Sequence, residues 1–329
     1  MTIAVTGATG YLGAQMLLRL MDAGHPFLAI DRAGTLPEAL RGQGMSTLDV
    51  KLEETDLLVS LFQQHQVTDV IHISDAGSVP QSINDPLTYY RNNTVGALAI
   101  IAACARAGVT NFVLSSTASV YGVPQRIPIA EEENLDPIAP FGASMAMAER
   151  IVNDVATSKG LNVVTLRYFN AAGADPEGRA GERGKPQHLI KVAAQIAVGT
   201  RKEKLKINGR DYQTPDGTTI RDYAHVADIA DAHLSSIEYL KDGGASRTLN
   251  VGYGQGASIL EVVKAVERVT GKPLPREDAP RRVGDPPLLI ADNAAIRSTL
   301  DWTPQYDDLD FIVRSAIEWE KLQAENNQS

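Results

Sequence analysis

The first 31 residues contain the feature that most constrains the fold of this chain. A short apolar run, Thr2 to Thr6, leads into Gly7-Ala8-Thr9-Gly10-Tyr11-Leu12-Gly13, and a helical stretch and a second apolar segment then lead to Asp31. The order strand, glycine turn, helix, strand and acid is typical of a dinucleotide-binding unit. Glycines permit a tight turn and the close approach of a pyrophosphate, which the helix N-terminus attracts. We therefore expect a dinucleotide site and not merely a structural turn.

The acid at the end of this unit indicates which dinucleotide is bound. Asp31 can accept a hydrogen bond from a ribose hydroxyl, whereas its carboxylate would repel a 2′-phosphate. The adjacent Arg32 weakens this preference because it could pair with such a phosphate. We predict NAD as the cofactor.

Alternation of strands and helices continues after Asp31. We expect strands at Ser46–Asp49, Asp69–Ile73, Asn111–Ser115 and Asn162–Arg167, and helices at Glu53–His65, Pro86–Ala107 and Gly142–Lys159. Such alternation predicts a parallel sheet with helices on both faces. The fold class is thus α/β, a Rossmann-type doubly wound parallel sheet.

The alternation of strands and helices ends after Tyr168, and Gly173–Lys185 is rich in glycine, proline and charged residues, as loops are. Helices are predicted at Leu189–Val198, at Ser258–Thr270 with Ser258 as cap and Glu261 three residues on, and at Leu309–Ala324, and a strand at Thr248–Val251. We expect an NAD-binding domain at residues 1–170, with a later return near 222–252, and a smaller α+β substrate lobe at 171–329. Substrate would lie in the cleft between them.

Composition excludes several classes of function. The 329 residues carry a net charge of −9, which disfavours nucleic acid or an anionic membrane as a partner. No apolar run is long enough to span a bilayer and no targeting segment is evident, so we expect a cytoplasmic protein. The single Cys104 is predicted to be a buried helix residue, and no spacing of His, Cys, Asp or Glu indicates a metal site.

A long series of segments carries a family resemblance that runs from Thr2 to about Trp319. Beyond the glycine turn it includes Val70-Ile71-His72, Tyr89 through Gly96, Leu114 through Gly122, Arg167-Tyr168-Phe169-Asn170, and Asp211 through Val226. The chain resembles the extended short-chain dehydrogenase/reductase family, also described as NAD-dependent epimerases and dehydratases. Within it the chain is most similar to the UDP-hexose 4-epimerases.

The resemblance implies a function and a set of site residues. In these enzymes a tyrosine removes the sugar 4-hydroxyl proton while hydride passes from C4 to NAD, and the 4-keto sugar turns over and is reduced on its other face. A lysine four residues later lowers the tyrosine pKa and holds the nicotinamide ribose, and a Ser or Thr, here Thr117, bonds the sugar oxygen. The positions implied to bind cofactor are Gly7, Gly10, Tyr11, Leu12, Gly13, Asp31, Arg32, Asp49, Val50, Ile73, Asn92 and Ser115. Those implied to bind the UDP-sugar are Asn170, His188, Leu189, Asn208, Arg221, Arg282 and Asp285.

The catalytic pair itself departs from the family pattern. Pro140-Phe141-Gly142-Ala143-Ser144-Met145 places Phe141 at the tyrosine position and Met145 at the lysine position. Phe141 has no proton to exchange and Met145 has no charge. Loss of a positioned acid/base typically costs about 10²–10⁴-fold in rate, whereas the fold should tolerate these volume-conserving replacements.

Other positions depart as well. Asp75 and Gly77 stand at a family glycine and lysine, and His188, Asn208 and Leu289 replace an asparagine, an aromatic residue and a tyrosine around the UDP pocket. Thr117 alone is a poor base because nothing in the sequence activates its hydroxyl, and Tyr121 stands at a structural position. Asp75 and His188 are ionisable alternatives, and tolerated drift is the competing interpretation.

Two hypotheses follow. One is an NAD-dependent UDP-hexose 4-epimerase with a non-standard or impaired acid/base site. The other is a catalytically inactive homologue that binds ligand or a partner. The resemblance also implies a homodimer that pairs through the helices at Pro86–Ala107 and Gly142–Lys159.

Overall fold

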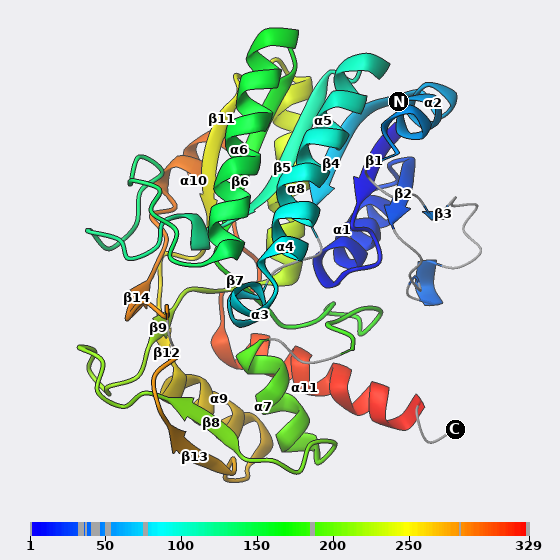
Figure 1. Ribbon diagram of the computed structural model, residues 1–329. Helices are drawn as coiled ribbons and strands as arrows, with labels where there is room; N and C mark the ends of the chain where they lie inside the picture. Colours follow the sequence, from blue (N-terminus) through cyan, green and yellow to red (C-terminus); the bar gives the residue numbers. More distant parts are fainter. Residues whose placement is uncertain are drawn as a thin grey trace.

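A seven-stranded parallel sheet organises the larger part of the chain (Figure 1). The structure, a computed structural model, describes residues 2–31, 36, 38–40, 47–49, 54–74, 78–184, 188–282 and 284–326, with the backbone alone at 47–49. The strand order is β11-β6-β5-β4-β1-β2-β3, and every neighbouring pair is parallel. The strands span β1 (Thr2–Thr6), β2 (Phe27–Asp31), β3 (Thr47–Asp49), β4 (Val67–Ile73), β5 (Asn111–Thr117), β6 (Asn162–Tyr168) and β11 (Arg247–Val251).

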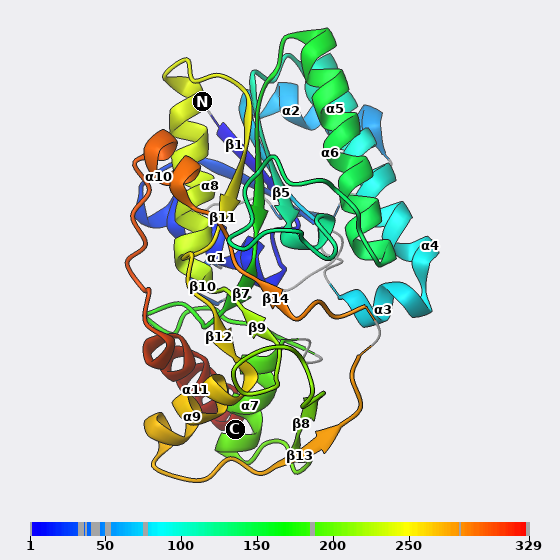
Figure 2. The ribbon, with the colours of Figure 1, turned by 90° about the vertical axis from the view of Figure 1, so that its left-hand side faces the viewer.

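Helices cover both faces of this sheet (Figure 2). Apolar side chains of α1 (Tyr11–Asp22) and α8 (Val226–Lys241) form one core with the first face. Those of α2 (Thr55–Gln64), α5 (Gly96–Ala107) and α6 (Pro140–Lys159) form a second core with the other, in which Cys104 is buried. This doubly wound arrangement confirms the predicted fold class. The carboxyl ends of β1, β4 and β5 therefore meet at one edge, where ligands bind in such folds.

The predicted helix at Pro86–Ala107 is one continuous helical run with a widened turn. It consists of α4 (Pro86–Tyr89), a π-helical segment η2 (Tyr90–Val95) and α5. Within the π-helical segment the Asn93 amide donates to Ser144 Oγ at 3.0 Å, and Thr94 Oγ1 donates to the Ser144 carbonyl at 2.9 Å. The widened turn thus lies where this run is bonded to α6, and π-helical turns are frequent at functional sites.

The remaining elements form a smaller group below the sheet edge (Figure 1). Helices α7 (Leu189–Val198), α9 (Ile259–Thr270) and α11 (Leu309–Asn326) pack on one another, and Ser258 and Glu261 form the predicted capping box at the start of α9. Short strands pair as β7 with β10, β8 with β13, and β9 with β12 and β14. Their bounds are β7 (Asn170–Ala172), β8 (Leu205–Asn208), β9 (Ile220–Arg221), β10 (Tyr223–His225), β12 (Ala257–Ser258), β13 (Arg276–Ala279) and β14 (Leu288–Leu289).

The shorter helices complete the described elements, namely α3 (Val79–Asn84), α10 (Ala294–Leu300) and the 3-10 helices η1 (Glu38–Leu40) and η3 (Ala118–Val120). Within the described ranges no helix combines the length and the apolar character that a membrane span requires. The domain boundary near residue 170 stays a prediction, while β11 lies at one edge of the large sheet.

A buried ion pair connects the sheet to α6. Arg167 on β6 donates to the Glu149 carboxylate from Nη2 at 2.7 Å and from Nε at 3.1 Å, and the two side chains are 8% and 4% exposed. Ser116 Oγ on β5 donates to the same carboxylate. Glu149 therefore joins two strands and a helix at a point where water is excluded.

Replacing Arg167 with Met should destabilise the fold by about 3–5 kcal/mol, because Glu149 would remain buried without its partner. Urea denaturation followed by circular dichroism measures this change. Arg150→Met is the matched control on the same helix, since the Arg150–Asp154 pair is solvent-exposed and should contribute nothing measurable. Equal midpoints for the two variants would contradict the structural role of the buried pair.

Candidate functional site

The glycine turn after β1 is packed so closely that two of its positions exclude a side chain. Gly7 has φ +63°, and a Cβ there would lie 2.3 Å from the Ile73 carbonyl oxygen. A Cβ at Gly13 would lie 1.9 Å from the Gly7 carbonyl oxygen. Gly10 is the N-cap of α1, so the start of this helix faces the space above the turn. The arrangement provides backbone N–H groups and a helix N-terminus for an anion.

Asp31 lies at the carboxyl end of β2, directly beside this turn. Its Oδ2 accepts hydrogen bonds from the Thr9 backbone N–H and from Thr9 Oγ1, both at 2.7 Å. These bonds fix the carboxylate on the side of the turn away from β4 and β5. That is the side on which an adenine ribose lies in dinucleotide-binding folds of this topology.

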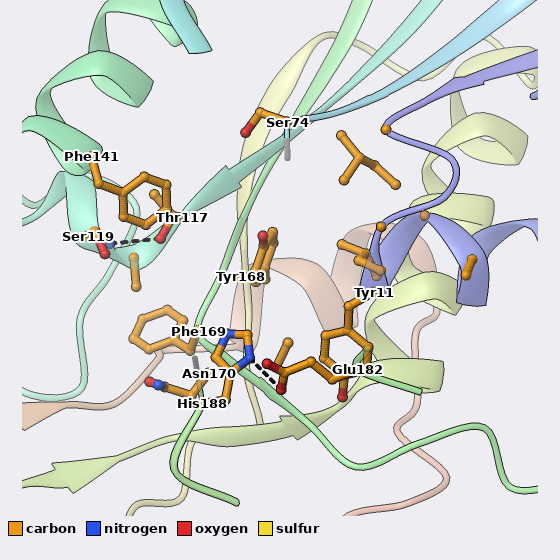
Figure 3. A pocket seen from close by; sticks show the side chains of 18 of the residues that line it. Tyr11, Ser74, Thr117, Ser119, Phe141, Tyr168, Phe169, Asn170, Glu182 and His188 are labelled. Atoms are coloured by element: carbon orange, nitrogen blue, oxygen red, sulfur yellow. Dashed lines mark hydrogen bonds and ion pairs between the residues drawn. The ribbon is translucent and has the colours of Figure 1, made fainter. Parts of the chain in front are cut away.

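A cavity of about 330 Å³ opens above the turn (Figure 3). Several residues that the sequence predicts for the site line it: Gly7, Gly10, Tyr11, Leu12, Gly13, Ile73, Thr117, Phe141, Asn170 and His188. Sequence reasoning did not assign other lining residues to the site, among them Ser74, Ser119, Tyr168 and Glu182. Ser119 and Tyr168 belong to segments that carry the family resemblance. Each lies two positions in the sequence from a predicted site residue, Thr117 or Asn170, and this proximity could have identified them.

The remaining predicted cofactor residues lie elsewhere or are not described. Asp31, Asn92 and Ser115 do not line the cavity, although Ser115 is buried at the end of β5. Only the backbone of Asp49 is described, on β3. Arg32, Val50, Asp75 and Gly77 lie outside the described residues, so their predicted roles stay predictions.

Phe141 lines the cavity, and Met145 is buried in the same apolar cluster without lining it. Together they form an apolar wall where the family resemblance places an acid/base pair. The Phe141 ring meets the Tyr89 ring edge-on at 6.1 Å, and Met145 is 2% exposed. Thr117 Oγ1 accepts a hydrogen bond from the Ser119 backbone N–H at 3.1 Å. Figure 3 shows Phe141, Thr117 and Ser119 together on one side of the cavity. This side therefore offers hydroxyl groups and an aromatic face.

The phenols around the first cavity are protonated at neutral pH. Burial, reinforced by the Glu182 charge, raises the pKa of Tyr11 well above its ordinary value, and the Tyr11 hydroxyl donates to the Gly173 carbonyl at 2.6 Å. Burial also raises the pKa of Tyr168. Tyr121 is fully buried, with its pKa raised by burial to about 12, and bonds Asn250 and Arg167. None of the three is suited to accept a proton.

A second cavity of about 620 Å³ adjoins the first. It is lined by every predicted substrate residue, namely Asn170, His188, Leu189, Asn208, Arg221, Arg282 and Asp285, and also by Leu289. Arg221 is buried on β9 and its Nη2 donates to the Asp285 carboxylate and to the Pro286 carbonyl. With its amide oxygen turned toward Arg282, Asn208 accepts from that guanidinium at 3.2 Å. Two guanidinium groups thus border one cavity, as an anionic ligand requires.

The two cavities meet at shared residues, among them Ser119, Asn170, His188 and Leu289. His188 is the N-cap of α7, and its Nδ1 lies 2.9 Å from Glu182 Oε2. The Glu182 carbonyl in turn accepts from Lys191 Nζ and from Trp319 Nε1. Helices α7 and α11 therefore fix this junction. Within the described part of the chain, no group of three or more His, Cys, Asp or Glu could hold a metal ion.

Comparisons with known proteins agree with this geometry. The model of the NAD dependent epimerase/dehydratase family matches residues 3–252. The UDP-glucose 4-epimerase of Azospirillum brasilense is 46% identical over 97% of this chain and 92% of its own length. A UDP-glucose-4-epimerase from Stenotrophomonas maltophila, crystallised with NAD and formylated UDP-arabinopyranose, matches with a TM-score of 0.93 and 33% identity over 99% of both chains. The Brucella ovis enzyme in complex with NAD matches with a TM-score of 0.91 and 37% identity over 97% of this chain and 98% of its own.

Asp31→Ser should weaken NAD binding about 10- to 100-fold, because hydrogen bonds to a charged acceptor would be lost. The same change should reduce the preference for NAD over NADP, since the carboxylate no longer opposes a 2′-phosphate. Isothermal titration with each dinucleotide measures both effects. Asp56→Ser, at an exposed acid on α2, is the control, and an unchanged ratio of the two affinities would contradict this placement of the ribose.

Proposed function

Because this chain belongs to the NAD-dependent epimerase/dehydratase family, we propose that it is a UDP-hexose 4-epimerase-like protein whose acid/base site is impaired. It binds NAD in the first cavity and a UDP-hexose in the second. The observation that carries the proposal is the apolar wall of Phe141 and Met145 beside an otherwise complete pair of cavities.

The residues around the glycine turn fit NAD. A Cβ at Gly7 or Gly13 would collide with neighbouring backbone, so only glycine keeps this turn tight beneath the start of α1, where a pyrophosphate would bind. Asp31 is fixed where a ribose diol would lie. When bound, NAD supplies the acceptor and donor of the hydride. The protein's part is to hold the sugar C4 next to that group and to move the hydroxyl proton.

The second cavity supports a UDP-sugar as ligand. Arg221 and Arg282 can neutralise a diphosphate, and Asp285 and Asn208 offer a carboxylate and an amide for ribose and base. Asn170 lines both cavities and would contact the ligand where they meet. A sugar attached to this diphosphate would lie toward Thr117 and Phe141.

The side chains around the first cavity are poorly suited to proton transfer. Thr117 and Ser119 are hydroxyls with no described base beside them, and the phenols of Tyr11 and Tyr168 have raised pKa values. His188 is bonded to Glu182 at the far end of the first cavity, close to Tyr11 (Figure 3). We therefore expect oxidation at C4 to be slow. Of the two alternative bases predicted from the sequence, Asp75 and His188, the second lies within the described residues.

A second candidate is a protein that binds NAD and a UDP-sugar without turnover. Burial of Phe141 and Met145 in one apolar cluster with Tyr89 and Tyr121 favours it, because this cluster excludes charge from the reacting end of the site. Incubation with NAD and either UDP-glucose or UDP-galactose, with the two sugars quantified by chromatography and any NADH followed at 340 nm, separates the two. Interconversion of the two sugars supports the enzyme, and binding of NAD and a UDP-sugar without interconversion supports the second candidate.

Replacing Phe141 with Tyr and Met145 with Lys together should raise epimerase activity by about 10²–10⁴-fold, the usual contribution of a positioned acid/base. The new phenol would lie next to Thr117, and the new ammonium would have the Ser74 hydroxyl as a partner. Interconversion of UDP-galactose and UDP-glucose, quantified by chromatography, measures the gain.

Each single substitution is the control for this experiment. Phe141→Tyr alone should gain much less than the pair, because a buried phenol without a cation keeps its proton. A double variant that binds NAD and UDP-glucose but stays inactive would overturn the view that impairment lies in this pair.

The protein is further proposed to form a homodimer through the helical run at 86–107 and α6. These helices expose large apolar side chains at Leu87, Val95, Leu98 and Met147, and Leu87 is 80% exposed. Figure 2 shows α4, α5 and α6 side by side on one flank of the molecule. Such a patch on adjacent helices is typical of a protein interface. A cytoplasmic location and the absence of nucleic-acid partners stay predictions.

Light scattering coupled to size exclusion should give twice the chain mass of 35.3 kDa. Leu98→Glu combined with Met147→Glu should yield a monomer, because two charges would be buried without partners. Leu322→Glu, at a similarly exposed apolar position on α11, should leave the dimer intact. A wild-type monomer at micromolar concentration would refute the interface.

A further inference from the structure

The Ser74 hydroxyl lies beside the sulfur of Met145. Ser74 follows β4 directly and lines the first cavity, and its Oγ donates to the Met145 thioether sulfur at 3.5 Å. Figure 3 shows Ser74 at the edge of the cavity opposite Asn170 and His188. The Met145 sulfur itself does not line the cavity, so among the described residues Ser74 is the polar group that this corner presents to a ligand.

The strand order fixes which half of a dinucleotide this corner faces. The glycine turn follows β1, and Asp31 ends β2 on one side of it. On the other side, Ser74 follows the last residue of β4 and Thr117 is the last residue of β5. A dinucleotide bound across this point has its adenosine half over β2 and its second nucleoside over β4 and β5. Ser74 therefore faces the nicotinamide riboside half.

The Met145 sulfur that accepts from Ser74 is easily replaced by a stronger acceptor. A thioether is a weak hydrogen-bond acceptor, whereas a ribose hydroxyl is both a stronger acceptor and a donor. Met145 is 2% exposed and keeps its apolar packing whether or not it accepts this bond. Replacing the sulfur with a ribose oxygen thus improves the hydrogen bond of Ser74 without disturbing the wall.

We propose that Ser74 Oγ binds a hydroxyl of the nicotinamide ribose of NAD. The inference rests on the proposed function, because it requires NAD in the first cavity. A neutral serine in this role holds the ribose but brings no positive charge to lower the pKa of a neighbouring acid. Cofactor binding is thereby kept separate from proton transfer.

Ser74→Ala tests the proposal with three ligands that differ in the second nucleoside. NAD and ADP-ribose both contain the second ribose, and ADP lacks it. The affinities for NAD and ADP-ribose should fall about 3- to 10-fold, as expected for one neutral hydrogen bond, and the affinity for ADP should stay unchanged. Isothermal titration of the full-length protein gives the three values, and a thermal melt shows that the variant is folded.

Two further variants separate a ligand contact from a structural effect. Ser74→Thr keeps the hydroxyl and should retain most of the ADP-ribose affinity. Met145→Leu removes the thioether acceptor and should leave ADP-ribose affinity equal to or above that of the wild type. An equal loss for ADP and ADP-ribose in Ser74→Ala, or no loss for ADP-ribose, would overturn the proposal. If the wild type binds neither ADP nor NAD, the proposed cofactor site itself is wrong, a result distinct from a failure of Ser74 alone.

Discussion

The geometry of the site depends on the buried carboxylate of Glu149. It accepts from Ser116, the residue before Thr117, and from Arg167 on the next strand, and it lies one helical turn after Met145 on α6. Arg167 also donates to the Tyr121 hydroxyl and to the Glu131 carbonyl, so the segment that follows Thr117 is attached to the same centre. Because these bonds involve neither Phe141 nor Met145, the end of β5 and the start of α6 keep their relative positions whatever side chains stand at 141 and 145. The frame of the site is therefore independent of whether residues 141 and 145 form an acid/base pair.

Local signals account for the parts of this structure that sequence predicts well. The glycine turn, the capping box at Ser258 and the helix at Leu189–Val198 each depend on residues close together in the chain, and each is found at the predicted position. The parallel sheet follows from the alternation of short strands and helices. Local propensity and periodicity were sufficient for these features.

Contacts between distant residues explain what sequence did not predict. The π-helical turn at Tyr90–Val95 is bonded to Ser144 some fifty positions away, and no local pattern marks it. The Ser74–Met145 contact joins residues 71 positions apart. Arg221 and Asp285 were each predicted as ligand residues, but their mutual pairing appears only when β9 and the segment before β14 come together. Such contacts are set by packing, which periodicity does not encode.

Charge is distributed unequally along the two cavities, and this separates binding from chemistry. Arg221, Arg282 and Asp285 border the second cavity, whereas the hydroxyls of Thr117 and Ser119 and the ring of Phe141 border the first cavity near the end of β5.

An ammonium about 4 Å from a phenol would stabilise the phenolate by roughly 4 kcal/mol at an effective dielectric constant of 20, which corresponds to about three pKa units. Residues 141 and 145 are one helical turn apart and share a face of α6, so a phenol and an ammonium there would act as a pair. Without the ammonium a phenol at 141 would keep its proton, as Tyr168 does, and without the phenol an ammonium at 145 would be a buried charge lacking a partner of opposite sign. Phe141 leaves an ammonium at 145 without a phenolate to stabilise, and Met145 leaves a phenol at 141 without a cation. Phe141 and Met145 together are therefore the stable alternative to the acid/base pair that the family resemblance places there.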